Sequence, residues 1–223
     1  MSAAVAGLDA AVAALAARIA AHGPGRRVIA IAGPPGAGKS TLADALVAAL
    51  PNAAAFPMDG FHFDDGLLEA RGLRPRKGAP ETFDVGGFAH MLERLRRRDE
   101  AEVVVPVFDR DIEVSRGSAR PIGREVETIV TEGNWLLLDE APWRDLRPLF
   151  DLTVRLDVPM AELERRLTSR WTGYGLSGAE LRAKMEGNDL PNARRAVERS
   201  GPADMVLHAD GTLDQDTQTG SRA

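Results

Sequence analysis

A glycine-rich segment at residues 33–41 has the residue types and the spacing that bind nucleotide phosphates. It reads Gly-Pro-Pro-Gly-Ala-Gly-Lys-Ser-Thr and fits the pattern G-x-x-x-x-G-K-[ST]. Glycines let the backbone turn its N–H groups toward phosphate oxygens, and a helix that follows adds a positive dipole end. In such a loop Lys39 reaches the β- and γ-phosphates and Ser40 places its hydroxyl on Mg²⁺. The predicted nucleotide-binding residues of the loop are Gly33, Pro34, Gly36, Ala37, Gly38, Lys39, Ser40 and Thr41.

Two carboxylates follow predicted strands and are expected to face this loop. Asp59 follows a strand predicted at residues 53–57, and Glu132 follows an apolar strand predicted at 127–131. In doubly wound sheets ligands bind at the carboxyl ends of the strands, so both acids would emerge at one edge. Two carboxylates beside one phosphate site make sense with Mg²⁺ between or beside them. Taken alone, each acid also fits a turn or a helix cap.

The rest of the sequence predicts the strands and helices that must position these residues. A short β-branched strand is expected at residues 28–32, directly before the loop. Further strands are expected at 53–57, 103–107, 127–131, 152–158 and 205–208, and helices at 39–50, 85–98, 160–171 and between 177 and 199. Strands that alternate with helices predict an α/β fold with a doubly wound parallel sheet of about five strands, covered on both faces as a three-layer sandwich.

Three segments lie outside this alternation. An N-terminal helix within residues 1–25 is expected to pack on the domain, because one of its faces carries Leu8, Val12, Leu15 and Ile19. Residues 64–83 are rich in glycine, proline and charge and predict a long surface excursion, a feature that is often functional. From Gly211 to residue 223 the polar sequence predicts a disordered tail. The domain itself is therefore expected over residues 26–210.

Composition limits the partners and the cellular setting. The formal net charge is −5 and no long basic tract occurs, which argues against a nucleic-acid partner. A basic cluster at residues 94–98 is interpreted as the solvated end of a helix. The chain has no cysteine, no apolar run long enough for a membrane span and no basic leader before an apolar run. We therefore expect a cytoplasmic protein that binds no membrane.

Two kinds of protein with such a loop fit these residues: a small-molecule kinase and a regulatory NTPase that acts on a protein partner. A switch-type GTPase would carry an N/T-K-x-D motif, and none of the lysines (Lys39, Lys77 and Lys184) lies in one. The paired carboxylates and the long excursion favour a kinase with a pocket for an acceptor.

Five sequence blocks occur in the order seen in one superfamily of kinases. They are the loop at 33–41, Pro-Met-Asp-Gly-Phe-His at 57–62, Arg-Lys-Gly-Ala-Pro-Glu-Thr-Phe-Asp at 76–84, Pro-Val-Phe-Asp-Arg at 106–110 and Thr-Glu-Gly-Asn-Trp at 131–135. Over residues 26–208 the chain resembles the phosphoribulokinase/uridine kinase/bacterial pantothenate kinase superfamily. It is most similar to the branch of nucleoside or sugar kinases that includes fructose-transport-system kinases. The resemblance implies a kinase that uses ATP and Mg²⁺ and has a helical lid, and relatives often form homodimers.

The resemblance also implies roles for single residues. Asp59 matches the catalytic base that takes the proton of the acceptor hydroxyl, and Glu132 matches the acid that supports Mg²⁺. The blocks that line the acceptor pocket of relatives contain, in this chain, Phe83, Asp84, Phe108 and Arg110. His62 either bonds a substrate hydroxyl or packs between Phe61 and Phe63.

A lid helix is implied after the strand at 152–158. Arg166 and Arg170 lie four residues apart and share a helix face, from which lid arginines close over the nucleotide and the transferring phosphoryl group. A solvated basic face is the alternative. Asn192 either contacts substrate or nucleotide or caps the helix that follows it. The predicted catalytic set is therefore Lys39, Asp59, Glu132 and Arg170.

The acceptor is left open by the sequence. Relatives of the uridine and pantothenate types carry histidine and tyrosine after Arg110, and residues 111–114 contain neither. A sugar such as fructose or a nucleoside is the favoured acceptor. The alternatives are a pantothenate-like molecule and, in a different class, a regulatory ATPase that acts on a protein partner.

Overall fold

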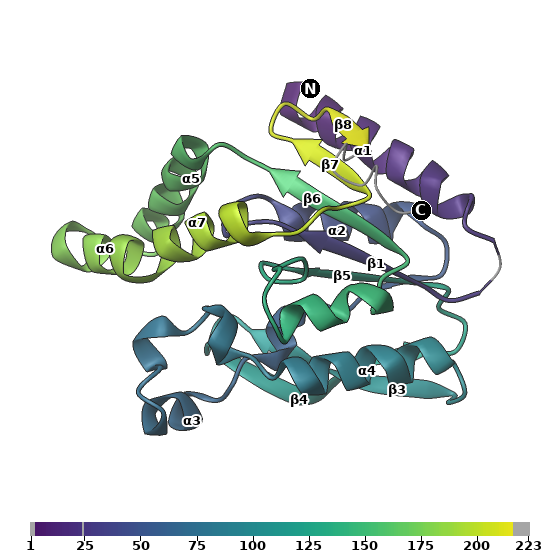
Figure 1. Ribbon diagram of the computed structural model, residues 1–223, viewed down its shortest axis with the longest axis horizontal. Helices are drawn as coiled ribbons and strands as arrows, with labels where there is room; N and C mark the ends of the chain where they lie inside the picture. Colours follow the sequence, from purple (N-terminus) through teal and green to yellow (C-terminus); the bar gives the residue numbers. More distant parts are fainter. Residues whose placement is uncertain (1–2, 24, 216–223) are drawn as a thin grey trace.

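The computed structural model describes residues 3–23 and 25–215 and has a six-stranded sheet at its centre, with the strand order β2-β5-β1-β6-β7-β8. The strands are β1 (Arg27–Ala32), β2 (Ala53–Ala55), β5 (Thr128–Gly133), β6 (Leu152–Asp157), β7 (Met205–His208) and β8 (Leu213–Gln215). Neighbouring strands are parallel except for β7 and β8. The predicted doubly wound parallel sheet is therefore confirmed (Figure 1).

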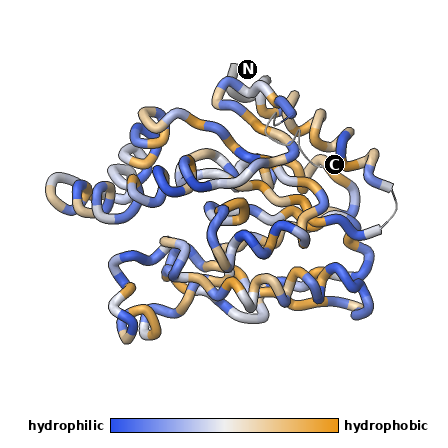
Figure 2. The backbone as a smooth tube through the Cα atoms, viewed as in Figure 1, coloured by the Kyte–Doolittle hydropathy of each residue, from blue (hydrophilic) through white to orange (hydrophobic). Residues whose placement is uncertain are grey.

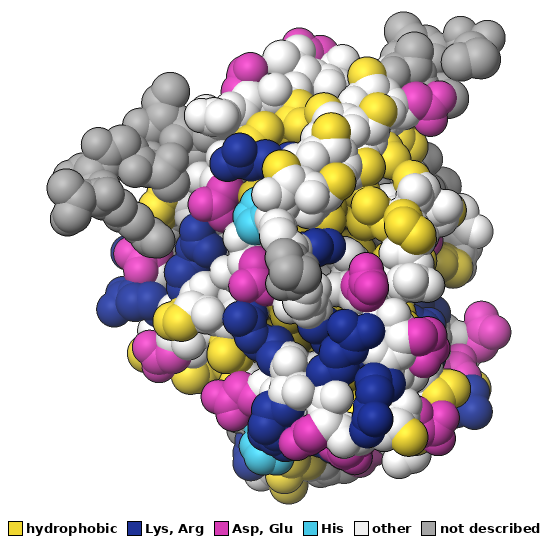
Figure 3. All heavy atoms as spheres, turned by 90° about the vertical axis from the view of Figure 1, so that its right-hand side faces the viewer, with side chains coloured by type: hydrophobic (Ala, Val, Ile, Leu, Met, Phe, Trp, Pro, Cys, Tyr) yellow, Lys and Arg dark blue, Asp and Glu magenta, His cyan; other side chains and the backbone are white. Residues whose placement is uncertain are grey.

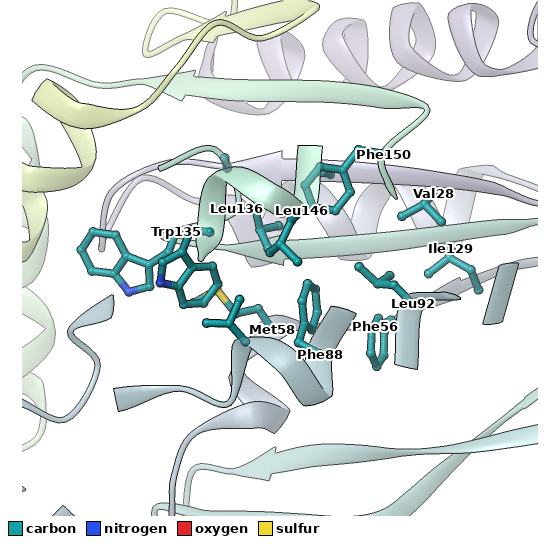
Figure 4. Packing of buried hydrophobic residues seen from close by; sticks show 14 of the residues in the cluster. Val28, Phe56, Met58, Phe88, Leu92, Ile129, Trp135, Leu136, Leu146 and Phe150 are labelled. Carbon is teal, nitrogen blue, oxygen red and sulfur yellow. The ribbon is translucent and has the colours of Figure 1, made fainter. Parts of the chain in front are cut away.

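Strand β1 is buried on both faces, as its apolar sequence predicts. Successive residues of a strand point to opposite faces, so they join two different apolar clusters. One cluster joins Val28 to α4 (Val85–Arg97), and the other joins Ile29 to α1 (Ala3–Ala20) and α2 (Lys39–Ala49). Figure 4 shows the first cluster, and Figure 2 shows hydrophobic stretches running through the middle of the molecule. Helices on both faces give the three layers.

The N-terminal helix α1 has the apolar face that its periodicity predicts. Val12, Leu15 and Ile19 are buried, and Leu8 packs against the same cluster, which contains residues of α2 and of the sheet. The helix therefore closes one side of the core near the phosphate-loop helix.

The strand predicted at 103–107 exists, but it does not belong to the central parallel sheet. The prediction that it joins that sheet was wrong. The strand forms β3 (Glu102–Asp109), which pairs antiparallel with β4 (Val114–Gly123) in a separate two-stranded sheet. Strand β4 was not predicted, because its sequence Val-Ser-Arg-Gly-Ser-Ala-Arg-Pro-Ile-Gly is polar and interrupted by glycine and proline. Strand β3 packs so closely on residues 58–61 that a Cβ on Gly60 would lie 2.7 Å from the Pro106 carbonyl oxygen.

Two outlying segments approach the carboxyl edge of the sheet. The excursion at 64–83 contains α3 (Asp65–Ala70) and 3₁₀ turns at Arg74–Arg76 and Pro80–Thr82. Beyond β6, the chain forms α5 (Met160–Gly173), α6 (Gly178–Lys184), a π-helical turn (Met185–Asp189) and α7 (Leu190–Arg199). Both segments extend to the same side of the molecule (Figure 1).

The basic cluster at the end of α4 has structural contacts. Arg94 pairs with Glu100 at 2.5 Å, and Arg96 pairs with Asp151 at 3.1 Å. Arg98 donates through Nε to the Arg124 carbonyl oxygen at 2.6 Å. Figure 3 shows Lys and Arg side chains gathered on the lower half of the face that contains this helix end. The cluster therefore serves the fold, in keeping with its interpretation as a helix end.

The chain beyond Gly211 differs from the expected disordered tail. Residues Leu213–Gln215 form β8, because an edge strand needs only backbone pairing with β7 and one apolar contact, which Leu213 supplies. The remainder of the predicted tail, residues 216–223, lies outside the described residues. Within the described part of the chain, no helix has the length and apolar character needed to cross a membrane.

Candidate active site

The loop between β1 and α2 has a backbone that its glycines make accessible. Gly36 and Gly38 have φ angles of 81° and 100°, in the left-handed region that other residues seldom adopt. Helix α2 begins at Lys39, directly after Gly38. The loop therefore lies at the carboxyl end of β1 and at the N-terminus of α2, which is the context that the phosphate-binding motif requires.

The ammonium of Lys39 is held inside the site. Its Nζ donates to the Pro34 carbonyl oxygen at 3.0 Å and to Asn134 Oδ1 at 2.7 Å. Burial lowers the pKa of Lys39, while the carboxylates of Glu132 and Asp59 act in the opposite direction. A lysine ammonium has three N–H donors, so one N–H remains for a phosphate oxygen.

Glu132 and Ser40 form the candidate metal site. Glu132 lies on β5 opposite Ile31 of β1, and Ser40 Oγ donates to Glu132 Oε1 at 3.0 Å. Burial raises the pKa of Glu132, and Lys39 opposes that shift. Mg²⁺ prefers oxygen ligands and commonly uses one or two carboxylates together with substrate phosphates. A buried carboxylate beside a hydroxyl at the phosphate loop therefore fits Mg²⁺, and the metal role of these two residues stays a prediction.

Asp59 is placed by a 3₁₀ turn, Met58–Phe61, that follows β2. Met58 is fully buried, and a Cβ on Gly133 would lie 2.4 Å from its sulfur, so the turn packs tightly on the end of β5. Asp59 Oδ2 accepts a hydrogen bond from Arg110 Nη2 at 2.6 Å, between side chains that are 21% and 52% exposed. The predicted base therefore faces a cation from the β3–β4 hairpin.

His62 packs between two aromatic rings that are tilted relative to its own. Its centroid lies 4.1 Å from that of Phe83 and 4.6 Å from that of Phe108, rather than between Phe61 and Phe63 as one expectation had it. Its Nδ1 lies 2.8 Å from the Asp59 carbonyl oxygen, which only accepts, so Nδ1 carries the proton. Burial lowers the pKa of His62, so the ring is neutral at pH 7 and Nε2 presents a lone pair.

The two arginines of α5 have different surroundings. Arg166 donates to Glu162 Oε1 at 2.7 Å and to the loop carbonyls of Gly36 and Ala37 at 3.3 and 3.2 Å. Arg170 lies one turn further along and lines the pocket, and its guanidinium forms no hydrogen bond or ion pair with any described residue. Arg170 is therefore a cation available to an anion in the pocket.

Two asparagines of the π-helical turn and α7, which pack beside α5, form a relay of amides in the pocket wall. Asn188 Nδ2 donates to the Lys77 carbonyl oxygen at 2.9 Å, and Asn192 Nδ2 donates to Asn188 Oδ1 at 3.0 Å. The Lys77 carbonyl fixes the orientation of both amides and leaves Asn192 Oδ1 buried without a partner in the described part of the chain. The helix-cap interpretation of Asn192 was wrong, because the π-helical turn runs directly into α7 at Leu190 and residue 192 is already helical.

One pocket of about 700 Å³ joins these elements. Of the residues predicted from the sequence, it is lined by Gly36, Gly38, Lys39, Ser40, Thr41, Asp59, His62, Phe83, Phe108, Arg110, Glu132, Arg166, Arg170 and Asn192. Gly33, Pro34 and Ala37 belong to the loop but are not part of this lining. Asp84 is not brought to the pocket and corrects a prediction: its carboxylate accepts from the Gly87 N–H at 2.8 Å and caps α4.

Sequence reasoning missed several residues of the lining. Lys77 Nζ lies 2.5 Å from Asp65 Oδ1 and 2.6 Å from the Glu113 carbonyl oxygen, so it ties the excursion to the hairpin turn. Asn134 was also missed, and it accepts a hydrogen bond from Lys39. Further lining residues that were not predicted come from the segment 160–199: Trp171, Tyr174, Lys184, Asn188 and Asp189. Lys77 and Asn134 lie inside two of the blocks that carry the family resemblance, and that was the available signal.

Comparison with known proteins finds similarity over most of the chain. The uncharacterized protein YggC of Escherichia coli K12 is 36% identical over 192 residues, which are 82% of this chain and 77% of YggC. Putative uridine kinase C227.14 of Schizosaccharomyces pombe is 32% identical over 200 residues, 82% of this chain and 83% of its own length. The crystal structure of a putative fructose transport system kinase from Silicibacter sp. TM1040 matches with a TM-score of 0.80 at 45% identity, over 87% of this chain and 98% of that one. No protein-family model matches the chain.

Proposed function

The chain belongs to the P-loop kinases of the phosphoribulokinase/uridine kinase/pantothenate kinase family, and on that premise we propose that it transfers the γ-phosphate of ATP to a hydroxyl of a small metabolite. One observation carries the proposal. A single pocket joins a phosphate loop, a buried hydroxyl–carboxylate pair suited to Mg²⁺ and a separate carboxylate, Asp59. Phosphoryl transfer needs these groups on the donor side and the acceptor side of one cavity.

The pocket residues divide between the two sides of the reaction. On the donor side Lys39 and the loop N–H groups bind the phosphates, and Arg170 stabilises charge on the transferring group. Ser40 and Glu132 would hold Mg²⁺, which supplies further neutralisation of phosphate charge when bound. Asp59 accepts the proton of the acceptor hydroxyl. At the same time the hydroxyl oxygen forms a bond to the γ-phosphorus, and the bond between that phosphorus and the β–γ bridging oxygen breaks, so that ADP leaves.

The acceptor side favours a compound with several hydroxyl groups. Two hydrogen-bond acceptors line it: the Asp59 carboxylate and His62 Nε2. Hydroxyl groups are donors and complement such atoms. A sugar such as fructose or a nucleoside has this character, which supports the acceptors favoured from the sequence.

The proposal is tested by measuring ADP release from purified protein with Mg·ATP. The acceptor panel contains fructose and other sugars, nucleosides and pantothenate, and Lys39→Ala provides the blank. Turnover that depends on one acceptor, and is absent in the blank, is the expected result. Hydrolysis that is equal in every well and independent of acceptor would instead indicate a regulatory ATPase. The cytoplasmic location, which is expected from the composition, and the homodimer, which is implied by the resemblance, stay predictions.

A further inference from the structure

Asn134 has a side-chain amide whose orientation is fixed by its neighbour. It directly follows β5 (Thr128–Gly133), and its Oδ1 accepts a hydrogen bond from Lys39 Nζ at 2.7 Å. A lysine ammonium only donates hydrogen bonds, so the amide atom that faces Lys39 must be the oxygen. The amide nitrogen, Nδ2, therefore points away from Lys39.

The Nδ2 group is open to the pocket. Asn134 lines the cavity, and no residue in the described part of the chain accepts a hydrogen bond from Nδ2. Asn134 is only partly buried, and its Nδ2 is not enclosed by protein. Two N–H donors of a neutral amide are thus available beside the Lys39 ammonium.

The position of these donors indicates what they bind. A lysine in a phosphate loop reaches the β- and γ-phosphates, and Asn134 shares a hydrogen bond with that lysine. Asp59, which faces the acceptor, contributes with Glu132 to the electrostatic environment of the same ammonium. The amide of Asn134 therefore lies between the phosphate loop and Asp59, where the proposed reaction would transfer the γ-phosphoryl group.

We propose that Asn134 is a further catalytic residue, which donates through Nδ2 to an oxygen of the γ-phosphoryl group while its Oδ1 holds Lys39 in place. This role rests on the proposed kinase function. A donor held in advance at a position where charge develops contributes about 10²–10³ in kcat. The amide adds this stabilisation without the desolvation cost that a further buried charge would bring.

The test compares nucleotides that differ only in the γ-phosphate. Dissociation constants for Mg·ADP and for the non-hydrolysable β,γ-imido analogue of Mg·ATP are measured by calorimetry for wild type, Asn134→Ala and Asn134→Asp. Asn134→Ala is expected to lose more affinity for the imido analogue than for ADP, and kcat should fall about 10²-fold. Asn134→Asp keeps an oxygen for Lys39 but has no N–H donor, so its kcat should fall at least as far.

The controls separate this role from a structural one. Asn52→Asp introduces the same charge change in an exposed turn far along the sequence and should leave both affinities and kcat unchanged. An equal loss of ADP and analogue affinity, or a wild-type kcat in Asn134→Asp, would overturn the role of Asn134 alone. Failure of the wild-type chain to bind either nucleotide would overturn the proposed function and this role with it.

Discussion

Replacing Asp59 with asparagine keeps the shape of the side chain and removes its negative charge and its capacity to take a proton. Asp59 lines the pocket, where we propose that it is the base, and pairs with Arg110 at 2.6 Å. A general base contributes about 10²–10⁴ in rate. At 1.36 kcal/mol for each factor of ten, the activation barrier should rise by about 3–5 kcal/mol.

The same substitution should change stability much less than it changes the rate. The Asp59 and Arg110 side chains are 21% and 52% exposed, so solvent screens their attraction. Ion pairs of this kind contribute about 0.2–1 kcal/mol to the free energy of unfolding. The expected result is therefore a large kinetic defect in a protein that folds and binds ATP as the wild type does.

The assay measures kcat with the acceptor that the wild type uses, the dissociation constant of Mg·ATP and the urea midpoint of unfolding. Asp84→Asn is the matched control, because Asp84 is exposed outside the pocket and asparagine caps a helix as well as aspartate does. A kcat for Asp59→Asn close to that of the wild type and of this control would refute the assignment of Asp59 as the base.

Three further perturbations test other parts of the molecule. Arg170→Ala should lower kcat by about 10³-fold or more with little change in stability, because the guanidinium of Arg170 has no hydrogen-bond or ion-pair partner among the described residues. Arg165→Ala, a change at an exposed position on the same helix, should stay near wild type, and equal defects in both variants would contradict the lid role. Folding keeps His62 neutral because burial lowers its pKa, so its contribution to stability is present above pH of about 6.5 and is lost as the pH falls below that value. The free energy of unfolding, measured in urea, should therefore fall more steeply from about pH 7.5 to 5.5 in wild type than in His62→Phe, and parallel curves would exclude this contribution. Leu46→Ala removes a fully buried side chain of α2 and should lower the free energy of unfolding by about 2–5 kcal/mol. Asp44→Ala, exposed on the same helix, should change it by less than about 0.5 kcal/mol, and similar urea midpoints for the two variants would mean that α2 is not anchored through Leu46.

The parts of the site that the sequence predicted are those governed by local rules. The loop at 33–41 encodes its own backbone through Gly36 and Gly38, and the strand-end rule places Glu132 at the same edge. The contact between Lys39 and Asn134 joins residues that are 95 positions apart and depends on the pairing of β1 with β5. Sequence patterns carry no signal for such a pair until the register of the sheet is known.

Strand β4, which was missed, has residues of low strand propensity and depends on backbone pairing with β3. Strand β4 exists because β3 pairs with it across a turn, although Gly117 and Pro121 are poor strand residues. Asp84 shows the opposite error: it was predicted to bind substrate because it lies in the block at 76–84, but its carboxylate caps α4. A helix cap and a substrate ligand use the same residue type, and only the position of the side chain distinguishes them.

Because β3 and β4 form a sheet of their own, the wall that we propose for the acceptor is separate from the strands that hold the phosphate loop. The hairpin contributes Phe108 and Arg110 to the pocket and meets the 3₁₀ turn at the close approach of Gly60 to Pro106. Substitutions along this hairpin would alter what is phosphorylated while the strands that hold the phosphate loop stay intact. In the descent of such kinases, acceptor preference can thus diverge while the use of ATP is inherited unchanged.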